Sequence, residues 1–309
     1  MTPKVISVNI SEKKGTVKNP VPKIELTPYG VAGDAHAGDW QRQVSLLAKE
    51  SFERFESSTK RKTSYGEFAE NITTEGIELH KLNILDKLKI GEVLLEVTQI
   101  GKECHGTSCA IYNEVGNCVM PKEGIFARVL QNGSIAANMD ILLLKRSVKL
   151  CVIVLSDRAS KGEYTDRSGI AIQKMMENFF EKNDWNYSVE YHLIPDSSEQ
   201  LTNLLIEQRK KQTDVIITTG GTGISPRDIT PETVKPLLDK EIPGIMEMIR
   251  WKYGQNKPNA LLSRGIAGVM ENSLVYTLPG SLKAITEYIT EIQNTLQHLI
   301  FMLHRIDAH

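Results

Sequence analysis

The first half of the chain is marked by short apolar runs that are separated by glycine, asparagine and proline residues. The runs are three to five residues long, which suits β-strands better than helices. They are Val5–Val8, Val44–Leu47, Leu88–Ile90, Val93–Val97 and Ile141–Leu144. One helix is expected, from Lys49 to Phe55 or Ser58. Many short strands with turns between them predict a mainly β, barrel-like domain.

The second half of the chain, after Lys149, alternates between strands and helices. Leu150–Leu155 is a continuous apolar run, typical of a parallel strand that is buried on both faces. A helix is expected from about Asp166, because apolar residues then recur at helical spacing. Later strands are expected at 187–193, 214–219 and 273–278, and later helices after Ser197, from Thr230 and from Ser281 to His304. The alternation predicts a doubly wound α/β domain with a mostly parallel sheet.

The change of pattern places a domain boundary near Lys145–Val148. We therefore expect a multi-domain chain made of two domains, residues 1–146 and residues 148–309. The full length of 309 residues suits two average domains.

The composition indicates a globular protein with a proper core, because 40% of the residues are hydrophobic and 24% are charged. The 37 basic and 38 acidic residues nearly balance, which argues against a nucleic-acid binder or a polybasic membrane binder. No apolar stretch approaches the ~20 residues that cross a bilayer, and the N-terminus lacks the apolar core of a signal peptide. Four cysteines are too few for a disulfide scaffold. We therefore expect reduced thiols in a cytoplasmic protein.

A glycine-rich segment from Thr218 to Glu232 carries the most information about function. It leaves a predicted strand and enters a predicted helix, which is where α/β folds bind ligands. Its glycines let backbone N–H groups approach an anion, and the helix N-terminus adds a positive dipole end. Thr219 and Thr222 can donate further hydrogen bonds to phosphate oxygens. The segment predicts a phosphate-binding loop, with a plain tight β–α turn as the alternative.

Two aspartates lie beside this loop in the predicted fold. Asp228 ends the loop, and Asp196 follows the strand that ends at Ile194. Carboxylates beside a phosphate cradle suit Mg²⁺, which takes one or two protein carboxylates and completes its shell with phosphates and water. The alternative is helix capping, because Asp196 precedes Ser197 and Asp228 precedes Thr230.

Five motifs in this half resemble those of the molybdopterin adenylyltransferases of the MoaB/Mog family, which are related to the G domain of gephyrin. The motifs are Leu155–Ser160, Ile194–Asp196, Thr218–Glu232, Leu262–Arg264 and Leu278–Ser281. They occur in order and cover essentially the whole half. The resemblance implies transfer of AMP from Mg·ATP to the terminal phosphate of molybdopterin, with release of pyrophosphate. It also implies a homotrimer that forms through this domain.

The resemblance further implies roles for single residues. Asp196 and Asp228 match the catalytic acidic residues of the family, and they are the predicted Mg²⁺ ligands. Arg264, with Arg227 as a second candidate, is expected to contact phosphate, the alternative being a solvated surface charge. The predicted substrate- and nucleotide-binding residues are Ser156, Asp157, Thr219, Gly220, Gly221, Thr222, Gly223, Ser263, Arg264, Pro279, Gly280 and Ser281.

Three cysteines of the first half, Cys104, Cys109 and Cys118, fall within 15 residues. A structural zinc site usually has four ligands with short paired spacings such as C-x₂-C, and the wider spacings here make zinc a weaker alternative. Lys102 and His105 can favour the thiolate form of Cys104. A buried, inert thiol is the other alternative.

Further motifs of the first half resemble those of a MOSC domain, the module shared with the C-terminus of molybdenum cofactor sulfurases. The motifs are Gly33–Gly38, Arg42–Leu46, Gly66–Ile72, Leu88–Gly91 and Val97–Gln99. The resemblance covers residues 1 to about 146 and makes Cys104 the signature cysteine of the family. It implies that Cys104 carries sulfur as a persulfide or contacts a molybdenum or tungsten cofactor. Asp34, His36 and Asn71 are candidate pterin- or sulfur-site residues.

Both halves point to molybdenum cofactor chemistry. We predict an enzyme of cofactor biosynthesis that adenylylates molybdopterin with its C-terminal domain and binds or sulfurates the pterin or the finished cofactor with its MOSC domain. Other cofactor-biosynthesis proteins, such as a metal insertase, are the expected partners. The rival interpretations are a non-catalytic carrier or scaffold and a metal-inserting molybdotransferase, which shares the α/β domain. The sequence leaves open whether molybdenum or tungsten is served.

Overall fold

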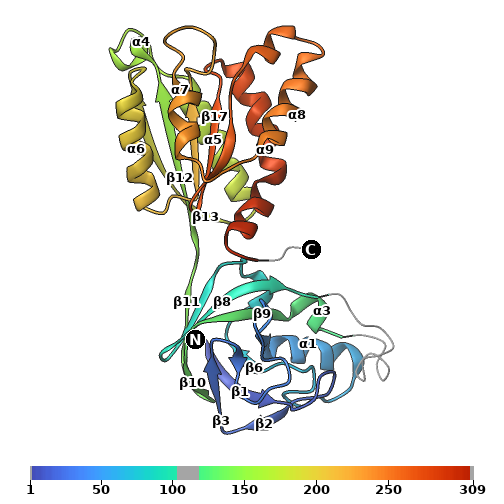
Figure 1. Cartoon of the computed structure of the whole chain (residues 1–309). Coiled ribbons are helices and arrows are strands. Elements are labelled where there is room, and N and C mark those ends of the chain that lie inside the picture. The colour runs from blue at the N-terminus through green and yellow to red at the C-terminus, as the bar shows by residue number, and fades with distance from the viewer. Residues whose placement is uncertain (1, 103–117, 307–309) are drawn as a thin grey trace. The chain divides into compact units, whose positions relative to one another are not determined.

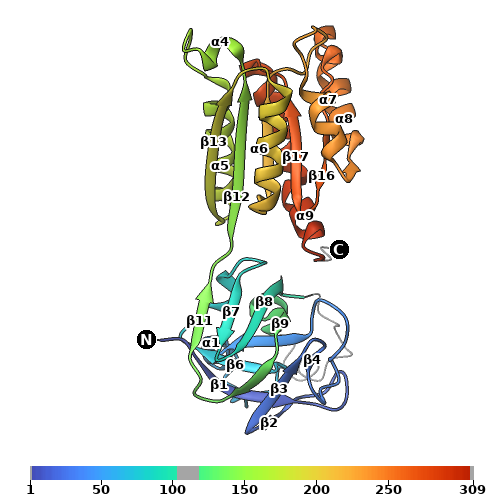
Figure 2. The same cartoon turned by 60° about the vertical axis from the view of Figure 1, so that its left-hand side comes forward.

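The computed structural model describes residues 2–102 and 118–306. The chain divides into two compact units, Met1–Arg146 and Ser147–His309, which are drawn in Figures 1 and 2. No helix in the described ranges is long and apolar enough to cross a membrane.

The N-terminal unit is built mainly from strands. They are β1 (Lys4–Ile10), β2 (Asn19–Val21), β3 (Lys23–Thr27), β4 (Gly30–Val31), β5 (Val44–Ala48), β6 (Ile72–Glu75), β7 (Lys87–Ile90), β8 (Val93–Ile100), β9 (Ile125–Gln131), β10 (Gly133–Ala136) and β11 (Ile141–Leu144). Over the described residues, one sheet has the order β11-β7-β8-β9-β5-β6-β1-β2, and a smaller sheet has the order β10-β3-β4. Neighbouring strands run antiparallel, except that β5 and β6 are parallel.

The helical elements in the described residues of this unit are short. They are α1 (Lys49–Thr59), η1 (Leu79–Lys81) and α3 (Met120–Glu123). Phe52 and Phe55 of α1 make edge-to-face contacts with Phe68. A larger cluster joins Leu26 of β3 and Leu46 of β5, so the two sheets share one core.

The mainly β character of this unit is confirmed, and the predicted helix is α1. Neither sheet closes on itself within the described residues, so a barrel is not confirmed. Each predicted strand is present. β1, β7, β8 and β11 combine buried positions with partly buried or exposed ones, whereas every residue of β5 is buried.

The C-terminal unit is organised around one mixed sheet. Its strands are β12 (Ser147–Leu155), β13 (Asn186–Ile194), β14 (Val215–Thr219), β15 (Lys240–Glu241), β16 (Ala267–Met270) and β17 (Ser273–Leu278). The order is β13-β12-β14-β17-β16-β15. The first four strands are parallel, and β16 and β15 form an antiparallel edge.

Helices cover both faces of this sheet. They are α4 (Asp157–Ser160), α5 (Ser168–Lys182), α6 (Ser198–Lys210), α7 (Thr230–Val234), η3 (Lys235–Leu237), α8 (Pro243–Gly254), η4 (Pro258–Leu262) and α9 (Leu282–Leu303). Ile153 of β12 packs in one cluster with Leu201 of α6 and Val234 of α7. The next residue of β12, Val154, points to the other face and lies against Gly169 of α5. The unit therefore has the predicted doubly wound α/β architecture.

Candidate functional site in the C-terminal unit

The parallel strands β12, β13, β14 and β17 all end at one edge of the sheet, and their following loops meet there. The carbonyl oxygen of Leu278, at the end of β17, accepts a hydrogen bond from the Gly220 N–H at 3.0 Å. The Thr230 hydroxyl donates to the Gly220 carbonyl at 2.8 Å. The glycine-rich loop is thereby fixed between the end of β17 and the first turn of α7.

Three positions of this loop require glycine for identifiable reasons. Gly220 has a φ of 101° and packs so closely on the Leu155 carbonyl that a side chain would collide with it. Gly221 has a φ of 63°, and a Cβ there would lie 2.5 Å from the Thr230 hydroxyl. A Cβ on Gly223 would lie 2.7 Å from a carboxylate oxygen of Asp228. The loop therefore exposes bare backbone beside a carboxylate.

Asp196 lies at the end of β13 and is joined to the start of α4. Its carboxylate accepts from the Asp157 N–H at 3.3 Å, and its own N–H donates to the Asp157 carboxylate at 3.1 Å. Arg227, on the glycine loop, forms an ion pair of 2.6 Å with Asp157. Burial raises the pKa of Asp196, and the nearby charges of Asp157 and Asp228 raise it further, against the opposing effects of the Asp157 N–H and Arg227. The loops that follow β12, β13 and β14 thus bring Asp157, Asp196 and Asp228 close enough for the charges of the other two to act on Asp196.

The geometry does not support helix capping as the role of either predicted catalytic aspartate. Ser197, not Asp196, caps α6, because its hydroxyl accepts from the Gln200 N–H. The N-cap of α7 is Ile229, which makes no side-chain capping bond. Asp228 instead closes a turn by accepting from the Ser225 N–H at 2.7 Å. Each carboxylate therefore remains at the strand edge, beside the glycine loop.

Two predicted phosphate-binding side chains have protein partners in the structure. The Thr219 hydroxyl is buried and donates to the Pro279 carbonyl at 3.0 Å, so it ties β14 to the β17–α9 loop. The Arg264 guanidinium donates to the carbonyls of Gly223 at 2.6 Å and Asp228 at 2.8 Å, and it also pairs with Glu232. These contacts give both residues a role in shaping the loop, and the direct phosphate contact expected of them stays a prediction.

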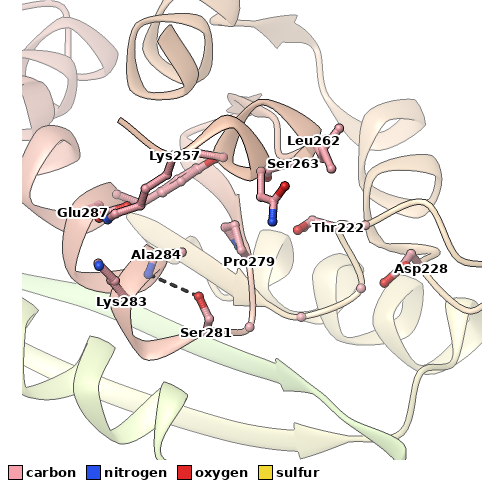
Figure 3. Close-up of a pocket in the computed structure, with 17 residues that line it drawn as sticks. Thr222, Asp228, Lys257, Leu262, Ser263, Pro279, Ser281, Lys283, Ala284 and Glu287 are labelled. Carbon is pink, nitrogen blue, oxygen red and sulfur yellow. Dashed lines mark hydrogen bonds and ion pairs between the residues drawn. The ribbon is translucent and has the colours of Figure 1, made fainter. Parts of the chain in front are cut away.

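A pocket of about 490 Å³ opens in front of the glycine loop (Figure 3). Among the predicted site residues, those lining it are Gly220, Gly221, Thr222, Gly223, Asp228, Ser263, Pro279, Gly280 and Ser281. The predicted residues outside its lining are Ser156, Asp157, Asp196, Thr219 and Arg264. Ser156 caps α4 by accepting from the Ala159 N–H. The remaining wall was not predicted and consists of Lys257, Asn259, Ala260, Leu262, Lys283, Ala284, Glu287 and Tyr288.

The acidic residues of this edge fit a divalent cation that also binds phosphate. Arg227 pairs with Asp157. Burial, and then the nearby charges of Asp157 and Asp228, raise the pKa of Asp196, and a cation beside Asp196 and Asp228 would stabilise the charged carboxylate against both effects. In residues 2–102 and 118–306, no group of three His, Cys, Asp or Glu side chains is placed to hold a metal ion. Mg²⁺ needs no such group, because phosphate oxygens and water complete its shell.

The N-terminal unit contains a separate buried polar cluster around Asp34. The Asp34 carboxylate pairs with the ammonium of Lys18, and both side chains are almost completely buried. It also accepts from the Asn71 side chain at 3.1 Å and from the His36 N–H at 2.9 Å. Burial alone would raise the pKa of Asp34, but the hydrogen bonds from His36 and Lys18 hold it well below its ordinary value. The structure thus brings Asp34, His36 and Asn71 together and adds Lys18.

Asn71 fixes this cluster to the sheet. Its side-chain oxygen accepts from the N–H and the hydroxyl of Ser45, at 3.1 and 3.0 Å. Cys104 and Cys109 lie outside the described residues. Cys118 is buried against the aromatic cluster of α1, and Cys151 is buried in β12, where desolvation raises the pKa of its thiol to about 12. Neither of these two buried thiols is poised for nucleophilic chemistry.

Two family descriptions match this chain. Residues 151–298 match the family described as a probable molybdopterin binding domain. Residues 33–141 match the MOSC domain family. The two matches fall in the two compact units.

Curated relatives match the C-terminal half. The molybdopterin adenylyltransferase of Helicobacter pylori is 35% identical over 51% of this chain and 89% of its own length. The molybdenum cofactor biosynthesis protein B of Staphylococcus aureus is 37% identical over 52% of this chain and 94% of its own length. Gephyrin of Dictyostelium discoideum is 36% identical over 50% of this chain but only 22% of its own length.

The fold, the strand-edge loops and these relatives define the C-terminal unit as a molybdenum cofactor biosynthesis domain. The chain belongs to the MoaB/Mog family through this unit and carries a MOSC domain in its N-terminal half. The predicted fusion of the two modules is therefore confirmed.

Proposed function

We propose that the C-terminal domain transfers AMP from Mg·ATP to the terminal phosphate of molybdopterin. The observation that carries this proposal is that Asp228 lines the pocket together with the glycine loop, while Asp196 lies close enough for the charge of Asp228 to affect it. The relative from Helicobacter pylori, which spans the domain, bears the name of the same activity. The residues of the site and the name of this relative both support an adenylyltransferase.

The reaction requires charge control and positioning rather than a protein nucleophile. A phosphate oxygen of molybdopterin attacks the α-phosphorus of ATP, a new P–O bond forms, and the bond to the β-phosphate oxygen breaks as pyrophosphate leaves. Both reactants are anions, so the site must hold them together and stabilise the charge of the transition state. The backbone N–H groups of Gly221–Gly223 can donate to phosphate oxygens, and Arg264 and Thr219 keep that backbone in place.

Asp196 and Asp228 are the residues that would hold Mg²⁺. The bound ion neutralises negative charge on the phosphate oxygens. Asp157 and Arg227 position Asp196 through their reciprocal hydrogen bonds and ion pair. In this arrangement the protein supplies fixed carboxylates and amides, and no side chain forms a covalent intermediate.

The test is incubation of the full chain with purified molybdopterin and Mg·ATP while pyrophosphate is measured. Release that requires both substrates is expected. Tight molybdopterin binding without pyrophosphate release would favour the rival interpretation, a carrier that holds phosphate in the glycine loop without reacting it.

For the MOSC domain we propose a site for a pterin or for transferred sulfur that includes Cys104, Asp34, His36 and Asn71. The polar cluster around Asp34 supports this, because a buried ion pair with a half-exposed histidine can orient a polar ligand. If Cys104 carries sulfur, intact mass spectrometry after exposure to a polysulfide, which transfers a sulfane sulfur to the thiolate and leaves as a chain one sulfur shorter, shows a persulfide adduct that is absent from Cys104→Ala. An adduct that persists in this variant would remove Cys104 from the proposal.

We also propose that the chain forms a homotrimer through its C-terminal unit and delivers its product to a metal insertase. Exposed apolar side chains support an assembly surface there, since Trp251 of α8 is 68% exposed and Leu261 of η4 is 55% exposed. Sedimentation equilibrium at micromolar concentration gives the mass of three chains if this is right, and of one chain if it is wrong.

A further inference from the structure

The wall of the pocket away from Asp228 is basic. Lys257 precedes η4, and Lys283 lies in the first turn of α9. Figure 3 shows Asp228 at one end of the pocket and Lys257, Lys283 and Glu287 at the other, with Pro279 between them. Neither lysine belongs to the five motifs that resemble those of the MoaB/Mog family.

The two lysines are unequally neutralised. Glu287, one turn after Lys283, forms its ion pair with Lys257. Across the described residues, no carboxylate lies within ion-pair distance of the Lys283 ammonium. The adjacent ammonium of Lys257 lowers the pKa of Lys283, the direction expected when two like charges share a site. An anion bound between them would remove this repulsion.

Backbone geometry places the start of α9, which carries Lys283, next to the glycine loop. Ser281 caps α9, and Gly280 lies against Gly220, where a Cβ on Gly280 would be 3.6 Å from the Gly220 Cα. The N-terminus of this 22-residue helix therefore faces the pocket next to the loop. The first N–H groups of a helix have no partner within the helix, and those that the cap does not satisfy can donate to an anion.

Two hydroxyl side chains belong to the same pocket. Tyr288 is 3% exposed and lines the pocket together with Ser263. Burial raises the pKa of Tyr288, and a hydrogen bond with the Ser263 side chain acts against this rise. The pocket therefore combines two lysine ammonium groups with side-chain hydroxyl groups, which are the kinds of donor that phosphate oxygens accept from.

We propose that Lys283, with Lys257 beside it, binds a phosphate group of a substrate at the end of the pocket away from Asp228. This inference rests on the proposed adenylyl transfer, which brings two phosphate-bearing substrates to one site. The group is either a terminal phosphate of the ATP triphosphate chain or the phosphate monoester of molybdopterin. A lysine ammonium suits either, because it acts as a mobile point charge toward phosphate oxygens.

The experiment measures binding to the full chain by titration calorimetry, without turnover. One arm uses inorganic pyrophosphate and α,β-methylene-ATP with Mg²⁺, and the other arm uses molybdopterin alone. Lys283→Met is expected to raise the Kd in one of the two arms by about tenfold or more, since a charged hydrogen bond is lost. The affected arm identifies the source of the phosphate.

Two further variants make this comparison specific. Lys283→Arg retains the charge and is expected to restore most of the affinity. Lys174→Met removes an exposed lysine on α5, outside the pocket lining, and should leave both arms unchanged. The Lys283 side chain is exposed, so its replacement should not alter the melting temperature.

The outcomes separate this inference from the proposed function. If Lys283→Met binds every probe within about twofold of the wild type, the phosphate site at Lys283 is wrong, even where AMP transfer occurs. If the wild type binds the probes through Lys283 but transfers no AMP, the transfer is wrong and the phosphate site stands. Failure of the wild type to bind any probe overturns the phosphate site.

Discussion

Asp228→Asn is expected to lower the kcat of AMP transfer by about 100-fold or more, while the fold is retained. Asparagine has a neutral oxygen that is a poor ligand for Mg²⁺ and a poor counter-charge at the strand edge. The same oxygen can still accept the Ser225 N–H, which is the turn-closing bond of the native aspartate. Steady-state kinetics and a thermal melt of the full chain check both parts of the expectation.

Asp239→Asn is the matched control. Asp239 also closes a backbone contact, because its carboxylate accepts from the Glu271 N–H at 2.6 Å, but it lies outside the pocket lining. Its replacement should leave kcat within about twofold of the wild type, as expected of an exposed side chain far from the reaction. If Asp228→Asn is as active as Asp239→Asn and differs only in melting temperature, Asp228 is a purely structural residue.

Gly223→Ala should reduce AMP transfer by about tenfold to 100-fold, because a displacement near 1 Å at a reacting site has effects of that size. The new Cβ would lie 2.7 Å from the Asp228 carboxylate, so that carboxylate must move. The backbone of Gly223 is not in the left-handed region, and alanine there adds no backbone strain. The defect should therefore appear in kcat, with little change in the melting temperature.

Gly244→Ala tests whether any added methyl group in this unit has the same effect. Gly244 is the second residue of α8, also has no positive φ, and a Cβ there would meet nothing within 4 Å. Full activity is expected for this variant. Equal activity of the two alanine variants would mean that the position of Asp228 does not matter for the reaction.

The buried strands of the C-terminal unit were predictable because their patterns are local. β17 has the predicted bounds Ser273–Leu278, and β12 extends the predicted apolar run by three residues at its start. β16 was missed, since Ala267–Met270 is short and includes a glycine. α8 was also missed, although Pro243 in its first turn and the buried Met246 and Ile249 are helix signals that the sequence contains.

The arrangement of the N-terminal strands was less predictable than their existence. Pairing of β3 with β10 joins residues more than a hundred positions apart. The parallel pairing of β5 with β6 also departs from the antiparallel pattern of the rest. Whether a sheet closes into a barrel depends on such distant pairings, which local periodicity does not encode.

The residues of the candidate site were likewise only partly predictable from the sequence. Asp196, Asp228 and the glycine loop were predicted together, because the carboxyl ends of parallel strands meet at one edge. Lys283 and the buried Lys18 were missed, since a lone lysine in a sequence is indistinguishable from a solvated one. Lys18 became notable only when the fold buried it against Asp34. Arg264 was predicted, but its partners are loop carbonyls and Glu232.

The most direct measurement of the central claim follows the adenylyl group itself. The full chain is incubated with molybdopterin and ATP labelled at the α-phosphate, with Mg²⁺, and the pterin product is isolated and weighed by mass spectrometry. A labelled product with the mass of molybdopterin plus one adenylyl group is expected from the wild type and from Gly244→Ala, and it should be strongly reduced in Asp228→Asn. Unmodified molybdopterin recovered from the wild type, with the label still in ATP, would contradict the proposed AMP transfer.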